Sequence, residues 1–241
     1  MRNEERIVNA VAAALERETQ VNLHNFPLQL EFADGVLTIE GEVEHIKAKK
    51  RALEVAAAIP GVDSIVDRIH IAPAEAMADG EIRDRVCKAL LAESLLDTCA
   101  IWAIVKGKSE VVREADQGVD GSIDVEVRAG VVTLNGAVSS LNVTRLAGVL
   151  AWWVPGSRDV VNGIEEIPSE EDNADEIIDA VRLVLEMDPF VNASQIKVSC
   201  ANDWVTLDGL VKNESVRQLA EADAWYVFGV DGVTNRILVE A

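Results

Sequence analysis

This chain is poor in aromatic residues, proline, cysteine and positive charge. Of its 241 residues only 4% are aromatic, and it has six prolines and three cysteines. Cys87, Cys99 and Cys200 form no C-x-x-C pair and cannot all be bridged, so the chain has no disulfide framework. Such sparse cysteines are more typical of a reducing compartment than of an oxidising one.

Positive charge is scarce, with 22 Lys and Arg against 42 Asp and Glu and a formal net charge of −20. A protein that binds a nucleic-acid duplex needs clustered Lys and Arg to displace counterions. We therefore expect no nucleic-acid partner. The acidity itself indicates only solubility and self-repulsion.

The chain also has no long hydrophobic run. The longest nearly apolar stretch, Leu146 to Val154, is far shorter than the ~20 residues that span a bilayer. Residues 1–20 begin with charged residues and contain no apolar core of a signal peptide. We expect no transmembrane segment and a cytoplasmic location, or a periplasmic one if an export signal has been removed.

One pattern is present three times. Near-copies of V-x-T-x-x-G occupy residues 36–41, 131–136 and 204–209, and a second glycine follows each of them twenty residues later. Matched closing segments, of the form apolar-x-Asn/Asp-x-Ile, end at residues 69, 164 and 237. A repeat of this length indicates three structural units, which we place at residues 1–73, 74–168 and 169–241. Below, these are repeats 1, 2 and 3.

Each repeat is predicted to fold as α-β-β-α-β. Apolar residues at i, i+4, i+7 and i+8 predict the first helix, and period-two alternation predicts two strands joined by a tight turn. A second helix and a last strand follow. The expected fold class is therefore α+β, each repeat having a small three-stranded mixed sheet with two helices packed on one face. The predicted N-caps of the first helices are Asn3, Asp79 and Asn173.

Six glycines are expected to have structural roles. Gly41, Gly136 and Gly209 fall on the buried face of the second strand, where a glycine permits close approach of a neighbouring backbone. The later glycines are predicted to end the second helices as C′ residues: Gly61, Gly156 and Gly229.

Repeat 2 carries about twenty extra residues, around 99–121, which begin with an apolar run at 100–105. Long insertions of this kind are usually functional or disordered. The apolar run favours packing, so we expect a short extra hairpin or helix at an interface.

Two sets of residues are candidates for binding. Lys47, Lys49, Lys50 and Arg51 form a basic cluster on the second helix of repeat 1, and are either a lipid-headgroup site or a solvated helix face. Aromatic residues on the outward faces and flanks of the second helices, on the helix-free face of repeat 3 and in the insertion are candidates for an interface, with packing between units or chains favoured over a ligand or lipid site. They are Trp152, Trp153, Trp225, Tyr226, Trp204 and Trp102.

The sequence contains no catalytic or metal-binding motif that we recognise. Its three histidines are scattered, and it has no glycine-rich phosphate loop, nucleophile elbow or H-E-x-x-H. We therefore expect no enzyme activity, no metal and no cofactor. Cys200 is expected to be a small core residue, and Asp223 to lie at the edge of the apolar stripe of its helix.

The repeated pattern, as in residues 130–138 and 156–164, resembles the BON domain, named for bacterial osmotically induced and nodulation proteins. The resemblance implies α-β-β-α-β units in a bacterial protein, and binding of phospholipid or attachment to membranes. It implies no catalytic residues.

Two hypotheses follow. The first is a non-enzymatic protein that contacts phospholipid surfaces peripherally, in stress response or envelope maintenance. The second is a protein–protein interaction scaffold or stress-response adaptor with no lipid binding. Small repeats bury little surface alone, so we expect the repeats to pack on each other and leave self-association open.

Overall fold

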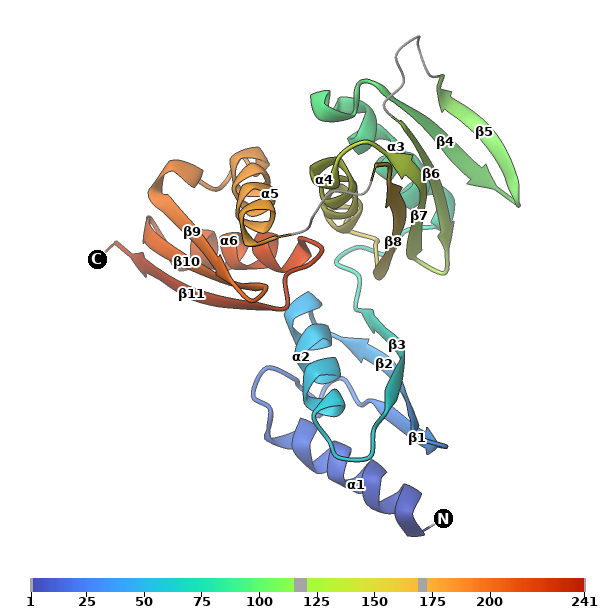
Figure 1. The fold of residues 1–241 in the computed structure, drawn as a ribbon, viewed down its shortest axis with the longest axis vertical. Coiled ribbons are helices and arrows are strands. Elements are labelled where there is room, and N and C mark those ends of the chain that lie inside the picture. The colour runs from blue at the N-terminus through green and yellow to red at the C-terminus, as the bar shows by residue number, and fades with distance from the viewer. Residues whose placement is uncertain (1, 115–120, 169–172, 241) are drawn as a thin grey trace. The chain divides into compact units, whose positions relative to one another are not determined.

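The computed structural model describes residues 2–114, 121–168 and 173–240. The chain divides into two compact bodies, Met1–Ala72 and Pro73–Ala241, which are described separately (Figure 1). The fold is a mixed α+β arrangement in which the described residues form six α-helices and three small mixed sheets.

The first body is repeat 1, with two helices and a three-stranded sheet. Its elements are α1 (Arg2–Arg17), β1 (Gln29–Ala33), β2 (Val36–Val43), α2 (Ile46–Ala57) and β3 (Ser64–Ile71). The order is β1-β2-β3, with β2 antiparallel to β1 and parallel to β3. Leu37, Ile39 and Val43 alternate along β2 and are buried, as are Val11 and Leu15 of α1. The residues that the periodicities predicted to face inward are therefore the buried core residues of repeat 1.

The second body contains repeats 2 and 3. Repeat 3 has the same topology as repeat 1, with sheet order β11-β10-β9. Its elements are α5 (Ala174–Met187), β9 (Ile196–Ala201), β10 (Trp204–Val211), α6 (Glu214–Tyr226) and β11 (Gly232–Val239).

Repeat 2 departs from the expected three strands, because its sheet has five, in the order β5-β4-β6-β7-β8. Its elements are α3 (Asp79–Ala92), β4 (Cys99–Val105), β5 (Lys108–Arg113), β6 (Gly121–Arg128), β7 (Val131–Val138), α4 (Leu141–Trp152) and β8 (Asp159–Glu166).

The two extra strands come from the insertion, which forms a hairpin rather than a helix. Lys106 and Gly107 both have positive φ at its two-residue turn, the conformation that matches the twist of paired strands. Ile101 is fully buried and Ala103 nearly so. The apolar run is therefore core in an enlarged sheet, and residues 115–120 of the insertion lie outside the described residues.

Only one of the three predicted N-caps is a cap. Asn173 Oδ1 accepts from the backbone N–H of Asp175 and Glu176, at 2.9 and 3.4 Å. Asn3 lies inside α1. Asp79 is the first residue of α3, and its carboxylate accepts from the N–H groups of Ala129 and Gly130 at 2.9 Å each. Asp79 therefore holds the β6–β7 turn against the helix.

The glycines divide into two groups. A Cβ on Gly136 or Gly209 would come within 2.2 Å of the carbonyl oxygen of Ser122 or Gln195, so the neighbouring backbone approaches too closely for any side chain. A Cβ on Gly41 would meet the Pro27 carbonyl at 3.0 Å. The prediction for Gly61, Gly156 and Gly229 is wrong, because the helices end several residues earlier, at Ala57, Trp152 and Tyr226.

Candidate functional site

The closing segment of each repeat ties its last strand to its second helix. In repeat 2 the Asn162 side chain donates to the Thr144 carbonyl of α4 at 2.7 Å, and in repeat 3 Asn235 donates to the Arg217 carbonyl of α6 at 2.9 Å. Each asparagine also accepts from the N–H two residues further on, at 3.4 and 3.1 Å. The repeated Asn-x-Ile pattern is therefore a helix-to-strand clasp.

Repeat 1 has Asp67 at this position, and a carboxylate cannot donate to a helix carbonyl. Asp67 keeps the second bond, accepting from Ile69 N at 2.8 Å. The Lys49 ammonium supplies the missing donor: its Nζ lies 3.0 Å from Asp67 Oδ2 and donates to the Ile69 carbonyl at 2.8 Å. Lys49 is 6% exposed. It is therefore built into the core of repeat 1, not presented to a headgroup.

The rest of the basic cluster is also tied to acidic residues. Arg51 bonds to Glu18 and Glu54, both at 2.5 Å, and the Arg51 guanidinium lowers the pKa of Glu18 chiefly by hydrogen bonding. Lys47 contributes to the same lowering. Lys47, Lys50 and Arg51 are only half-buried. None of the four cations is fully exposed, which is unlike a headgroup site.

Replacing Lys49 by methionine is expected to destabilise repeat 1 by about 2 kcal/mol, because it removes the ammonium that bonds to the Ile69 carbonyl and to the partly exposed Asp67 carboxylate. Hydrogen exchange of peptides covering β3 should accelerate strongly, with no change in repeat 2. Asp67→Asn should rescue the variant by restoring the amide clasp of the other repeats. Lys50→Met is the control and should cost less than about 1 kcal/mol. Equal effects of the two methionine variants would contradict the assignment.

The aromatic residues of α4 and α6 meet where repeats 2 and 3 pack together. The rings of Trp152 and Tyr226 stack with centroids 5.6 Å apart and an interplanar angle of 21°. Trp225 is 2% exposed. The Trp153 indole N–H donates to Asp223 Oδ1 across the contact at 3.1 Å. Trp152, Trp153, Asp223 and Tyr226 therefore join two repeats of the same chain.

Asp223 is buried rather than at the stripe's edge, with 3% of its surface exposed. It shares the site with Asp188, which is also buried and accepts from Phe190 N at 2.8 Å. Burial, followed by repulsion from Asp188, raises the pKa of Asp223 to about 8. Burial and Asp223 together raise the pKa of Tyr226. At neutral pH the contact therefore favours a neutral Asp223 carboxyl.

Arg145 is a residue of this contact that the repeat pattern did not identify. Its side chain is fully buried, and its Nε donates to the Phe228 carbonyl at 2.9 Å, from α4 to the segment after α6. The sequence does contain one signal that could have identified it, because Arg145 is the only charged residue of α4. A lone charge in an apolar helix marks a specific polar contact.

Trp204 and Trp102 lie on the faces of their sheets that carry no helix. Trp204 packs over Gly232, where an added Cβ would clash with its ring, and it donates to Thr234 Oγ1 at 2.8 Å. It remains 40% exposed. Trp102 is half-buried and pairs with Val111 of β5 and Asp124 of β6.

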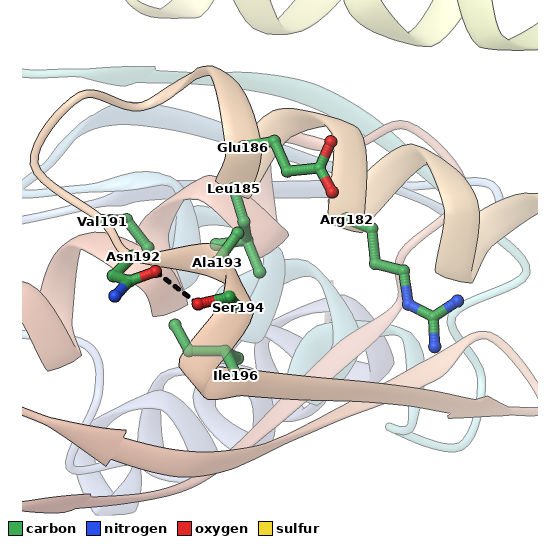
Figure 2. Close-up of a pocket in the computed structure, with 8 residues that line it drawn as sticks. All are labelled: Arg182, Leu185, Glu186, Val191, Asn192, Ala193, Ser194 and Ile196. Carbon is green, nitrogen blue, oxygen red and sulfur yellow. Dashed lines mark hydrogen bonds between the residues drawn. The ribbon is translucent and has the colours of Figure 1, made fainter.

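Two open pockets carry no assembled catalytic group. One of about 470 Å³ in repeat 3 lies between α5 and the start of β9 (Figure 2). In it Asn192 and Ser194 bond to each other at 2.7 Å, and the Arg182 side chain is 54% exposed. The other, of about 410 Å³ in repeat 1, is lined by Glu4, Glu5, Val8, Asn9, Leu30, Glu31 and Phe32.

The described part of the chain has no cluster of metal ligands, and Cys87 is an unreactive thiol. There, no three His, Cys, Asp or Glu side chains gather as metal ligands. Cys87 is buried, which raises the pKa of its thiol to about 11 and disfavours the reactive thiolate. Cys200 is only half-buried, less than expected. None of the helices described is both long and apolar enough to cross a membrane.

This chain belongs to the BON domain family. The family model, described as "BON domain", matches residues 3–73, 108–168 and 173–241. The middle match begins inside the hairpin and omits α3 and β4, as expected for a repeat that is interrupted by an insertion. A comparison with curated protein sequences gave no match.

Two solved structures resemble this chain. Both are of CdsD, which is a structural protein of the type III secretion system of Chlamydia trachomatis. Both are 14% identical to this chain and cover 98% of it, with 98% and 92% of their own lengths covered. The TM-score is 0.25 in each case, so no function is carried over from them.

Proposed function

We propose that this protein is a non-enzymatic interaction scaffold, in which repeats 2 and 3 act as one compact body that binds a protein partner. The observation that supports this best is the use of the aromatic residues. Trp152, Trp153 and Tyr226 pack repeat 2 on repeat 3, and Trp225 is buried, so these aromatic residues are not presented to a ligand.

The charges favour the same proposal. A peripheral membrane protein gains about 1 kcal/mol from each Lys or Arg near an anionic surface. Lys49 and Arg51 are held by Asp67, Glu18 and Glu54. The chain also carries a net charge of −20, which an anionic surface repels. Little cationic attraction remains.

Phospholipid binding is the second candidate function. Two observations support it. The chain belongs to the BON family, and resemblance to that family implies membrane association. In addition, Lys47 and Lys50 on α2 are only half-buried. If the protein binds phospholipid, the attraction of Lys47 and Lys50 to the anionic surface is electrostatic. It should therefore weaken as salt is added, because the screening length is only about 8 Å at physiological ionic strength.

Flotation of the purified chain with vesicles separates the two functions. The vesicles would be pure phosphatidylcholine, or phosphatidylcholine with about 40% phosphatidylglycerol to give an anionic surface, each at low and high salt. We expect no flotation in any condition. Flotation with anionic vesicles at low salt only, abolished by Lys47→Gln with Lys50→Gln, would overturn the scaffold proposal in favour of phospholipid binding.

A further inference from the structure

The helix-free face of the repeat 3 sheet carries an exposed apolar pair. Leu210 of β10 lies opposite Leu238 of β11, and the two residues are 45% and 67% exposed. Their neighbours on this face are the pair Asp208 and Arg236. Exposed leucines side by side on a sheet are unusual unless they contact another molecule.

The other repeats provide an internal comparison. At the same register position, repeat 1 pairs Glu42 with His70, and repeat 2 pairs Ala137 with Glu165. The two leucines are therefore not a requirement of the fold, since the same sheet forms with a charged residue or an alanine in place of Leu210 and with His or Glu in place of Leu238. They are a property of repeat 3.

The strand that carries Leu238 is also a poorly protected edge. β11 is eight residues long, ends its sheet in the described part of the chain, and has Arg236 as its only charged residue. The equivalent edge β3 has Asp67 and Arg68, and β8 has three acidic residues. Proteins normally place charges, prolines or bulges on exposed edges to prevent strand addition. β11 has little of this protection.

We propose that β11 is a self-association surface, on which a second copy of this chain pairs its own β11 in antiparallel orientation about Leu238. In that register Leu238 faces Leu238 of the second copy, and Ile237 faces Val239. Arg236 of each copy then faces Glu240 of the other. The leucines of β10 and β11 would form one continuous row of four across the joint.

The charges around the leucines favour a second copy over other occupants. Asp208 and Glu240 are acidic, and Arg236, Lys212 and the Lys197 that pairs with Asp208 are basic, so the patch carries both charges although the chain is strongly acidic. An anionic bilayer would be repelled by the net charge of −20. A second copy meets a charge pattern complementary to its own.

The association should be weak. One pair of short strand segments buries less than the roughly 1,200 Å² of a standard stable interface, which places it among transient contacts. We therefore expect a monomer–dimer equilibrium that becomes visible only at high protein concentration. The inference is independent of the proposed function, since either function could operate with monomers or dimers.

Sedimentation equilibrium of the full chain from about 10 µM to about 1 mM tests the proposal, this being the range in which weak contacts are detected. The wild type should show reversible dimers. Leu238→Lys removes the buried leucines and opposes two ammonium groups, so the dimer dissociation constant should rise at least about tenfold. Val161→Lys, at a 51% exposed site on the edge strand β8, is the matched control and should leave it unchanged.

A charge exchange tests the register. Arg236→Glu places a second carboxylate opposite Glu240 and should weaken the dimer, whereas Arg236→Glu combined with Glu240→Arg restores opposite charges and should recover it. Circular dichroism would establish that every variant is folded. A wild type that stays monomeric throughout, equal effects of the two lysine variants, or a double variant no better than Arg236→Glu would each overturn the proposal.

Discussion

Asp223→Asn is expected to stabilise the second body at alkaline pH, by on the order of 4 kcal/mol more at pH 9 than at pH 5. The asparagine keeps the size of the side chain and still accepts the hydrogen bond from the Trp153 indole N–H. It removes the need to bury a carboxyl group beside Asp188. An amide can also donate a hydrogen bond, which a carboxylate cannot.

The direction follows from the pKa of Asp223, which is about 8 in the folded chain and about 3.9 in an unfolded one. Below pH 4 the group is protonated in both states, so its full contribution to stability is present. Between pH 4 and 8 only the folded chain keeps the proton, and the free energy of unfolding falls by up to about 1.4 kcal/mol per pH unit. Above pH 8 the contribution is lost.

Urea unfolding followed by tryptophan fluorescence measures this directly, because all five tryptophans lie in the second body. The wild type should lose stability from pH 5 to pH 8, and the variant should lose much less. Asp231→Asn, at an exposed position just before β11, is the control and should follow the wild type. Parallel pH profiles of the wild type and Asp223→Asn would show that the buried carboxyl does not control the contact.

The repeat made much of the fold predictable. Three copies with the same glycine spacing fixed the register, so the buried residues of the second strands, such as Leu134 and Leu207, were identified from alternation alone. The hairpin of repeat 2 could be expected but not its pairing, because a single apolar run is compatible with either a helix or a strand. Its place beside β6 depends on contacts distant in sequence.

The candidate sites were less predictable, because a side chain's charge does not reveal its partner. Lys49 looks like its neighbours on α2, and only the change from Asn to Asp at position 67 distinguishes it. That signal lies eighteen residues away and is visible once Asn162 and Asn235 are seen to bond to helix carbonyls. Asp223 was a visible misfit in its stripe, but its partners Trp153 and Asp188 come from other elements.

Arg145→Ala is expected to lower the free energy of unfolding of the second body by about 3–5 kcal/mol, because it leaves a cavity between repeats and an unpaired carbonyl at Phe228. Arg145→Met separates the cost of the cavity from the cost of the lost hydrogen bonding. It retains most of the apolar volume of the side chain, so its cost should be only the lost hydrogen bonding, about 1–3 kcal/mol.

The same urea unfolding applies, with Arg182→Met as the control. Arg182 on α5 is 54% exposed and pairs only distantly with Asp179, at 3.8 Å, so its replacement should change stability by less than about 0.5 kcal/mol. If Arg145 joins the repeats, its alanine variant should also broaden the single transition into two, as repeats 2 and 3 begin to unfold separately. A sharp transition within about 0.5 kcal/mol of the wild type would mean that the aromatic contacts alone hold the repeats together.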